Sequence, residues 1–169
     1  NGDDNQDNEG TSKTTITWPA DTIVNLKEHY TVAEGTSLII KEGAQIIIST
    51  EGVGTNHVPV EFTVKGNLYC EGTAEKPIRF SIAETDRTAE NIFKKMWGGI
   101  VATETCEEML IDHTIIEYTG GEVVEGSPAA TAGIYTAGDD AYPQITTNNI
   151  NGKYVITNSI IRNGWSDGI

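Results

Sequence analysis

Short apolar runs, separated by glycines and other turn residues, recur along this chain at nearly regular intervals. A glycine stands directly or shortly before an apolar residue at five places, spaced by 30 to 35 residues, and these apolar residues are Leu38, Leu68, Ile100, Ile134 and Ile169. Further apolar runs lie between these marks, at 45–48, 61–64, 77–80, 109–111 and 115–118. Several short strands per period, with turns between them, are typical of one turn of a coiled β-structure. The pattern predicts about five stacked turns, which we call rungs.

A second repeat indicates where the rungs are interrupted. Residues 110–117 and 155–162 share the order apolar, apolar, polar, polar, hydroxyl, apolar, apolar, charged at a constant offset of 45 residues. Because this offset exceeds the basic period, we expect an insertion at 120–132 and a further loop at 139–142. Stacked rungs tolerate insertions, since the loops project sideways without breaking the strand ladder.

The segment 83–96 departs from the strand pattern. It carries acidic residues early and lysines late, and Ala89, Ile92, Phe93 and Met96 follow helical spacing. We therefore predict one short inserted helix, which would cover an edge or a face of the sheet.

The composition points to β-structure. Ile outnumbers Leu by 21 to 4, and Ile, Thr and Val together account for 53 of the 169 residues. Such β-branched side chains lose rotamer freedom in helices but pack well on pleated sheets. A helical bundle is thereby excluded, and the predicted fold class is all-β. No apolar run approaches the roughly 18 residues that a membrane-spanning helix requires.

The net charge of −14 is unevenly spread along the chain. Residues 1–12 hold four acidic and no basic residues, and we interpret them as a flexible acidic tether, because so polar a stretch cannot bury enough apolar surface to fold. Residues 96–152 hold nine acidic and no basic residues. A charge this negative disfavours binding to the phosphates of nucleic acid, which we exclude as a partner.

The two cysteines, Cys70 and Cys106, have neither the close spacing of a zinc site nor the density of a disulfide-stapled scaffold. We interpret them as two buried thiols. A disulfide joining neighbouring layers is the alternative.

Residues 155–169 resemble the parallel β-helix repeat of the pectin-lyase-like superfamily, in which an asparagine occupies a tight turn and a Gly-Ile pair opens the next strand. Asn158 and the pair Gly168 and Ile169 stand at these positions. His113 occupies the register of Asn158 one repeat earlier, which favours a turn residue over a catalytic one. The segments 66–80 with 97–100, and 17–21 with 34–40, are similar to exported β-helix lipoproteins of the Bacteroidetes type.

The resemblance implies a right-handed parallel β-helix over 13–169, with an N-terminal cap at about 14–30. It also implies a secreted or cell-surface protein, such as an outer-membrane lipoprotein that meets the membrane only through a lipid on its N-terminal tether. Since the sequence stops at the first residues of an expected strand, we expect the native protein to continue beyond Ile169. The resemblance carries no shared activity.

Candidate chemistry is limited to aromatic and acidic side chains near the expected loops. The sequence contains no recognisable Ser-His-Asp arrangement, phosphate-binding loop or His-x-x-x-His pair. Flat rings with polar edges stack on neutral sugars, and the candidates are Trp97, Tyr118, Tyr135, Tyr142 and Trp165. Calcium prefers clustered carboxylate and carbonyl oxygens on loops, and the candidates are Asp139, Asp140, Glu122 and Glu125. The alternatives are core packing for the rings and solvated loops for the acids, with no cofactor at all.

We therefore expect a non-catalytic binding or structural module with a polysaccharide as ligand, because a long repetitive face suits a long repetitive polymer. One alternative is a polysaccharide lyase or glycoside hydrolase whose active site lies partly beyond residue 169. A second alternative is an adhesin that binds protein.

Overall fold

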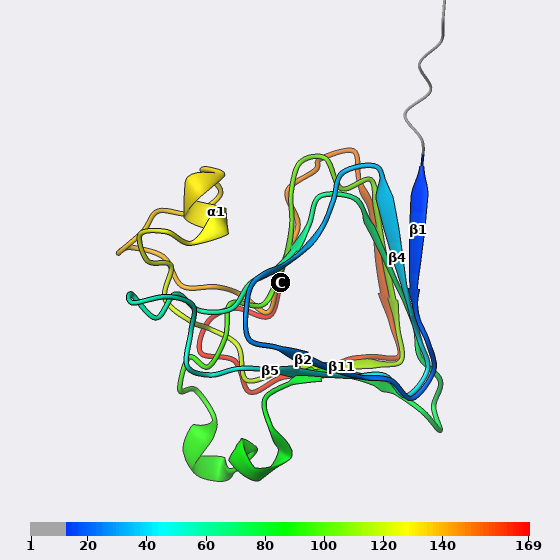
Figure 1. Ribbon diagram of the computed structural model, residues 1–169, viewed down its shortest axis with the longest axis horizontal. Coiled ribbons are helices and arrows are strands. Elements are labelled where there is room, and N and C mark those ends of the chain that lie inside the picture. The colour runs from blue at the N-terminus through cyan, green and yellow to red at the C-terminus, as the bar shows by residue number, and fades with distance from the viewer. Residues whose placement is uncertain (1–12) are drawn as a thin grey trace, which may run out of the picture.

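The computed structural model describes residues 13–169, which coil through three parallel β-sheets. Successive strands of each sheet overlap in Figure 1, so that the sheets appear as the walls of a roughly triangular prism. Sheet A consists of β1 (Thr14–Trp18), β4 (Thr36–Lys41), β7 (Asn67–Glu71), β10 (Glu108–Asp112) and β13 (Lys153–Thr157). Sheet B consists of β2 (Ile23–Leu26), β5 (Gln45–Ile48), β8 (Ile78–Ser81), β11 (Thr114–Glu117) and β14 (Ile160–Arg162). Sheet C consists of β3 (Tyr30–Val32), β6 (Phe62–Val64), β9 (Ile100–Ala102) and β12 (Ile145–Thr146).

Each of the first four rungs contributes one strand to each sheet, and every strand pairs in parallel with its equivalents in the adjoining rungs. Leu68, for example, pairs with Leu38 on one side and with Met109 on the other. The fifth rung contributes β13 and β14, after which carbonyl groups at 167–168 accept backbone hydrogen bonds from 144–145 beside β12. The predicted all-β parallel β-helix of about five rungs is confirmed.

The offset of 45 residues found in the sequence is the register between the fourth and fifth rungs. Leu110 pairs with Val155, and Ile115 pairs with Ile160. This alignment is therefore confirmed residue by residue.

The interval of 30 to 35 residues, in contrast, is not the length of a rung. Leu38 and Leu68 do pair, but Ile100 belongs to sheet C and Ile134 to a loop. The aligned inward residues of sheet A are Ile16, Leu38, Leu68, Met109 and Tyr154. The connections between sheets B and C lengthen over the first four rungs. Residues at a fixed sequence interval therefore fall at different places in successive rungs.

Residues 14–32 form the first rung. β1, β2 and β3 pair in register with β4, β5 and β6. The segment 14–30, where the N-terminal cap was expected, thus provides strands of the first rung. The tether predicted over residues 1–12 lies outside the described residues. No helix within 13–169 is long and apolar enough to cross a membrane.

Inward side chains stack in columns that run from rung to rung. One column in sheet A contains Trp18, Ile40, Cys70, Ile111 and Ile156, and one in sheet B contains Val24, Ile46, Phe80, Ile116 and Ile161. Because neighbouring strands lie about 4.8 Å apart, each inward side chain contacts its equivalents in the adjoining rungs. The columns mix Ile with aromatic and sulfur-containing side chains, so they are apolar without being uniform.

Both cysteines are free and buried, which confirms the interpretation as two buried thiols. Burial raises the pKa of Cys70 to about 12 and that of Cys106 to about 11. Both thiols are therefore protonated at neutral pH and contribute packing rather than reactivity.

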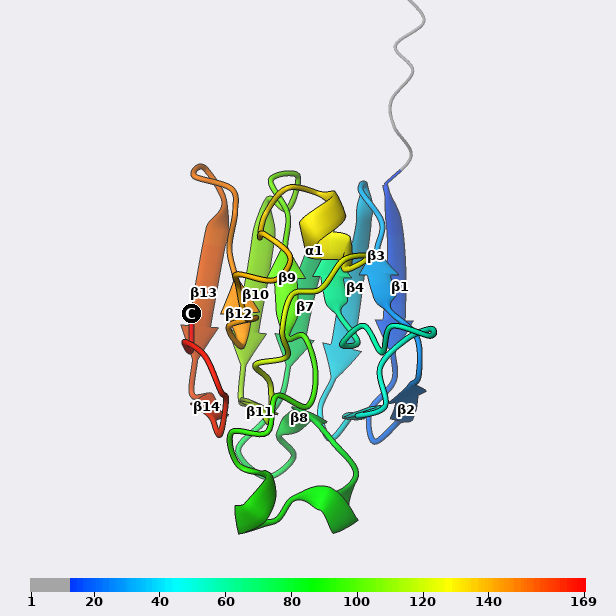
Figure 2. The same cartoon turned by 90° about the vertical axis from the view of Figure 1, so that its left-hand side faces the viewer.

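All three long insertions leave the β-helix at the corner between sheets B and C. They span 49–61, 82–99 and 118–144 in the second, third and fourth rungs, and Figures 1 and 2 show them projecting from one side of the molecule. The insertion predicted at 120–132, with its loop at 139–142, lies within the last of these. It carries a short helix that the sequence pattern did not predict, α1 (Pro128–Thr131).

The helix predicted over 83–96 is wrong. The segment forms two 3-10 turns, η1 (Glu84–Asp86) and η2 (Ala89–Asn91), and its later part is irregular, with Phe93 at a positive φ of 68°. A short helix with little packing is marginal in water. Polar side chains here also bond to local backbone, as Asn91 does to the carbonyl of Asp86, and such bonds compete with a helix.

Tight turns between sheets A and B use residues that tolerate positive φ. His113 (44°) and Asn158 (50°) occupy equivalent places in the fourth and fifth rungs, as the sequence predicts. Their side chains meet at Asp112: the Asn158 amide donates to its Oδ1 at 3.0 Å, and Nδ1 of His113 lies 2.9 Å from the same oxygen. His113 is therefore a turn residue.

Replacing Leu68 with Ala tests the inward columns. Leu68 has no exposed surface, so its truncation leaves a cavity and lowers the free energy of unfolding by about 2–5 kcal/mol. Leu110→Ala is the matched control, because Leu110 lies on the next strand of the same sheet and points outward; we expect it to cost about 1 kcal/mol or less. Urea denaturation followed by circular dichroism measures both, and equal losses would contradict the inward and outward assignment.

Candidate functional site

Within residues 13–169, no insertion covers the outer face of sheet A, which runs the length of the β-helix (Figure 1). Outward side chains form three rows across its strands. The central row is mainly apolar and contains Thr17, Ile39, Tyr69, Leu110 and Val155. One flanking row contains Ser37, Asn67, Glu108 and Lys153, and the other contains Lys41, Glu71, Asp112 and Thr157. The outer face of sheet A thus presents an apolar row between two polar rows.

Tyr69 lies at the middle of the central row. Its hydroxyl donates a hydrogen bond to Oε2 of Glu108 at 2.5 Å. Burial, together with the bond to Glu108 and its charge, raises the pKa of Tyr69 to about 12. The tyrosine is therefore neutral at physiological pH, and the bond to Glu108 fixes the orientation of a partly exposed ring.

Two hollows lie along this face. One, of about 340 Å³, is lined by Tyr69, Glu71, Leu110, Asp112, Lys153, Val155 and Thr157. The other, of about 650 Å³, lies near the starts of the strands and is lined by Lys13, Glu34, Ser37, Asn67, Thr105 and Glu107, among others. Apolar surface and hydrogen-bonding groups therefore lie side by side over several rungs, which is the combination that binding sites for small polar ligands use.

Sequence reasoning missed this face because it searched for aromatic residues near strand ends. Tyr69 lies in the middle of β7. The available signal was the alternation within 67–71, where Leu68 and Cys70 are buried and their neighbour Tyr69 must point outward.

Three of the five aromatic residues predicted as sugar contacts are buried. Trp97 and Tyr142 have no exposed surface, and Tyr118 exposes 5% of its surface. The indole N–H of Trp97 donates to the carbonyl of Glu117 at 2.9 Å. Because none of the three offers a ring face to solvent, they pack in the core instead of binding a sugar.

The other two aromatic candidates do not form a row. Tyr135 is half-buried, packs edge-on against Tyr142 with ring centroids 6.1 Å apart, and shares a hydrogen bond of 2.8 Å with the Thr146 hydroxyl. Trp165 is exposed, but the Lys95 ammonium lies 4.6 Å from the centre of its ring. Their role as sugar contacts stays a prediction.

Tyr142 helps to hold a buried carboxylate. Its hydroxyl donates to Oε2 of Glu61 at 2.7 Å, and the backbone N–H of Ala129 in α1 donates to the same oxygen at 3.1 Å. The Thr63 hydroxyl donates to Oε1 at 2.7 Å. Glu61 has no exposed surface and forms no ion pair within the described part of the chain. These neutral donors replace its water shell and tie the fourth-rung insertion to sheet C.

The four acidic residues proposed for calcium are not brought together. Glu122 pairs with Lys95, whose hydrogen bond and charge lower the pKa of the Glu122 carboxyl. Oδ2 of Asp140 accepts the backbone N–H of Thr136 at 2.6 Å, while Asp139 and Glu125 are exposed. Over residues 13–169, no group of three or more His, Cys, Asp or Glu side chains could hold a metal ion.

A second buried carboxylate, Glu117, lies on the outer side of sheet B among three arginines. Nη1 of Arg79 forms an ion pair with Oε1 of Glu117, and Nε of Arg162 forms one with Oε2 at 2.8 Å. Nε of Arg87 lies 3.9 Å from Oε1. Burial would raise the pKa of Glu117, but hydrogen bonds from Arg162 and Ser81 and the charge of Arg79 outweigh it and hold the pKa below its ordinary value. We call Arg79, Arg87 and Arg162 the arginine cluster.

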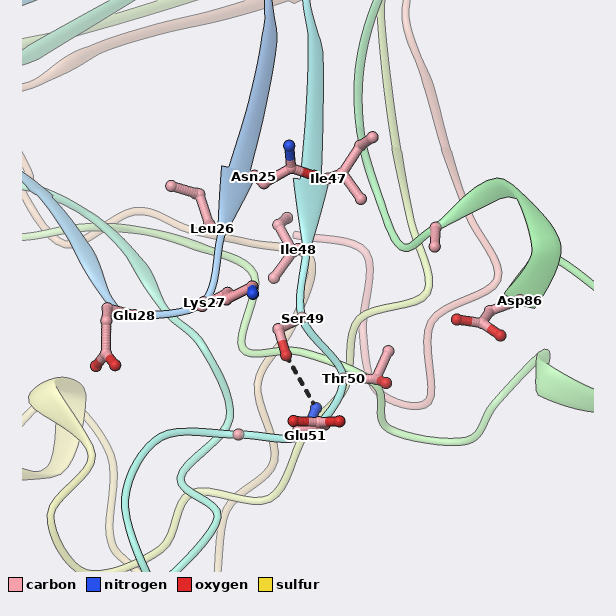
Figure 3. A pocket seen from close by; sticks show the side chains of 12 residues that line it. Asn25, Leu26, Lys27, Glu28, Ile47, Ile48, Ser49, Thr50, Glu51 and Asp86 are labelled. Carbon is pink, nitrogen blue, oxygen red and sulfur yellow. Dashed lines mark hydrogen bonds between the residues drawn. The ribbon is translucent and has the colours of Figure 1, made fainter.

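A further hollow, of about 470 Å³, lies between the end of β2, the loop after β5 and the segment 83–86 (Figure 3). Its charged side chains do not converge, since Glu28 and Asp86 lie on opposite sides of the view. The hydrogen bond drawn among its lining residues joins the backbone N–H of Glu51 to the Ser49 hydroxyl at 3.3 Å. With no converging polar groups, this hollow is a weaker candidate than the outer face of sheet A.

Comparison with known proteins identifies a family. The sequence model described as a pectate-lyase-like beta-helix domain matches residues 10–111, which is more than half of the chain. No curated protein and no solved structure matches the chain. The match supports the β-helix part of the resemblance seen in the sequence, whereas its lipoprotein part stays a prediction.

Acidification tests the charge balance at Glu117. A carboxyl whose pKa is lowered in the folded state stabilises that state above its ordinary pKa, and the stabilisation is lost as the pH falls through the lowered value. We therefore expect the Tm to fall steeply below about pH 4.5. Glu117→Gln should cost about 1–3 kcal/mol at pH 7, because it removes the negative charge that pairs with partly buried arginines, and should make the fall of the Tm below pH 4.5 less steep.

Glu71→Gln is the control for this experiment, because Glu71 pairs with Lys41 at the exposed surface and its loss costs about 1 kcal/mol or less. Thermal unfolding measured between pH 3 and 7 gives the Tm of the unsubstituted protein, of Glu117→Gln and of Glu71→Gln. If the Tm of Glu117→Gln falls below pH 4.5 as steeply as that of the unsubstituted protein, other carboxyl groups cause the fall.

Proposed function

The chain belongs to the pectate-lyase-like β-helix domain family, and from this premise we propose that it binds a neutral polysaccharide along the outer face of sheet A without cleaving it. The observation that carries the proposal is the central row, in which Tyr69 and its apolar neighbours lie between two polar rows. Sugar rings stack their C–H faces on such surfaces and direct their hydroxyls sideways to polar groups.

The repeat of the face supports a polymer as the ligand. Strands follow each other about every 4.8 Å along the β-helix, a spacing similar to the length of one sugar unit in an extended chain. A contact that one strand makes with one sugar unit can therefore be repeated by the next strand with the next sugar unit. A single sugar would use only a small part of this surface.

The charge of the face favours a neutral polymer. The three rows carry the acidic side chains Glu71, Glu108 and Asp112 and the basic side chains Lys41 and Lys153. Lys41 is already paired with Glu71 at 2.6 Å. A polyanion would meet uncompensated carboxylates here, and the protein as a whole, at −14, would repel it.

The carboxyl groups of this face favour binding over catalysis. A glycosidase needs one carboxylic acid that keeps its proton at working pH. Hydrogen bonds from Asn158, Thr157 and His113 lower the pKa of Asp112. Glu71 is paired with Lys41, and Glu108 accepts the Tyr69 hydroxyl. Each carboxylate is thus engaged as an ion or acceptor, and calcium has no part in the proposal.

The proposed site of action is the cell surface or the external medium. The support is the resemblance to exported β-helix lipoproteins and the acidic composition of residues 1–12. Protease treatment of intact cells that produce the protein should degrade it. Survival of the protein until the cells are lysed would contradict this location.

Substitution of Tyr69 tests the proposed site. Affinity electrophoresis in gels that contain xylan, mannan or a mixed-linkage glucan should show retardation by at least one polymer. Tyr69→Ala should weaken that binding about tenfold or more, as the loss of a central aromatic contact does. Tyr69→Phe keeps the ring and should retain most of the binding.

Trp165→Ala is the control, because Trp165 is an exposed aromatic residue that does not belong to sheet A. Loss of binding in this variant, with retention in Tyr69→Ala, would overturn the sheet A site and favour the corner of the insertions. New reducing ends or unsaturated sugars in the same mixtures would instead show a glycosidase or a lyase. Absence of retardation by every polymer would contradict the proposal.

A further inference from the structure

The arginine cluster contains every arginine of this chain. The sequence has only Arg79, Arg87 and Arg162, and all three approach the carboxylate of Glu117 from different parts of the fold. Arg79 belongs to β8 and Arg162 to β14, while Arg87 follows η1 in the third-rung insertion, which lies beside sheet B in Figure 1. In a protein with a net charge of −14, such a concentration of positive charge is unexpected.

One carboxylate does not balance three guanidinium groups. Glu117 supplies one negative charge, so the cluster retains two positive charges, which the exposed Glu84 near Arg87 partly offsets. Burial and the neighbouring charge of Arg79 lower the pKa of Arg87 more than Glu117 and Glu84 raise it. Arg79 and Arg87 therefore repel each other across a partly buried site.

The cluster also has unused hydrogen-bond donors. A guanidinium group carries five N–H donors. Over the described chain, Arg79 and Arg162 each donate one bond to Glu117, and Arg87 donates one to the carbonyl of Ile82. The side chains expose 23%, 47% and 19% of their surface for Arg79, Arg162 and Arg87, so the remaining donors can reach a ligand from solvent.

We propose that the arginine cluster binds an oxyanion of the sulfate or phosphate type. Two negative charges would match the excess charge of the cluster, and several oxygens would accept the donors that the protein leaves unused. Guanidinium groups suit such ligands because they present paired N–H donors in one plane. The site lies on sheet B and shares no residue with the outer face of sheet A, so it stands independently of the proposed polysaccharide site.

Titration with sodium sulfate, at an ionic strength held constant with sodium chloride, tests the site. Sulfate should raise the Tm and shift the NMR signals of the arginine Nε–H groups, with a saturable dependence on concentration. Arg162→Gln should weaken sulfate binding about tenfold or more, and Arg162→Lys, which keeps the charge, should weaken it less. Lys76→Gln is the control, because it removes the same charge from an exposed pair with Asp21.

Two further titrations identify the source of the oxyanion. A sulfated polysaccharide that binds through Arg162, when its desulfated form does not, would assign the site to a substituent of a polymer. Binding of inorganic sulfate or phosphate alone would assign it to the free ion. Equal effects of sulfate and chloride, or equal sulfate affinity in Arg162→Gln and Lys76→Gln, would overturn the proposal.

Discussion

In-register pairing of parallel strands is the constraint on which the rest of this structure depends. Each strand bonds to its equivalent one rung away, so side chains at equivalent positions must lie above one another at about 4.8 Å. Inward positions become apolar columns, such as the one through Leu38, Leu68 and Met109. Outward positions become rows, and the same register that builds the core therefore aligns Ile39, Tyr69 and Leu110 on an open face.

The constraint also decides where variation and buried charge are tolerated. Long connections leave at one corner, between sheets B and C, because an insertion there lengthens a rung without shifting its strands. Two carboxylates are buried near the resulting surfaces by different means. Neutral donors from Thr63 and Tyr142 surround Glu61 and hold an insertion in place, whereas arginines from the third and fifth rungs surround Glu117 and leave positive charge in excess. The donors around Glu61 leave no charge in excess, whereas the excess positive charge around Glu117 can attract an anion.

The sequence predicts the fold well because stacking leaves a periodic trace. It predicts the parallel β-helix, the offset of 45 residues and the turn role of His113, all of which depend on local pattern. It fails where tertiary contacts override local pattern. Residues 83–96 have helical spacing, but their polar side chains bond to nearby backbone. Trp97 and Tyr142 look like surface aromatics, but an insertion and the core enclose them. No local pattern reveals that Arg79, Arg87 and Arg162 meet.

NMR mapping of a bound oligosaccharide tests most directly whether the outer face of sheet A is the functional surface. The oligosaccharide would be cut from whichever neutral polymer the protein retains. We expect the amide signals that shift to belong to outward residues of β7, β10 and β13, in a band along the β-helix that includes Tyr69, Leu110 and Val155. Shifts confined to the insertions between sheets B and C, with sheet A unchanged, would contradict this expectation.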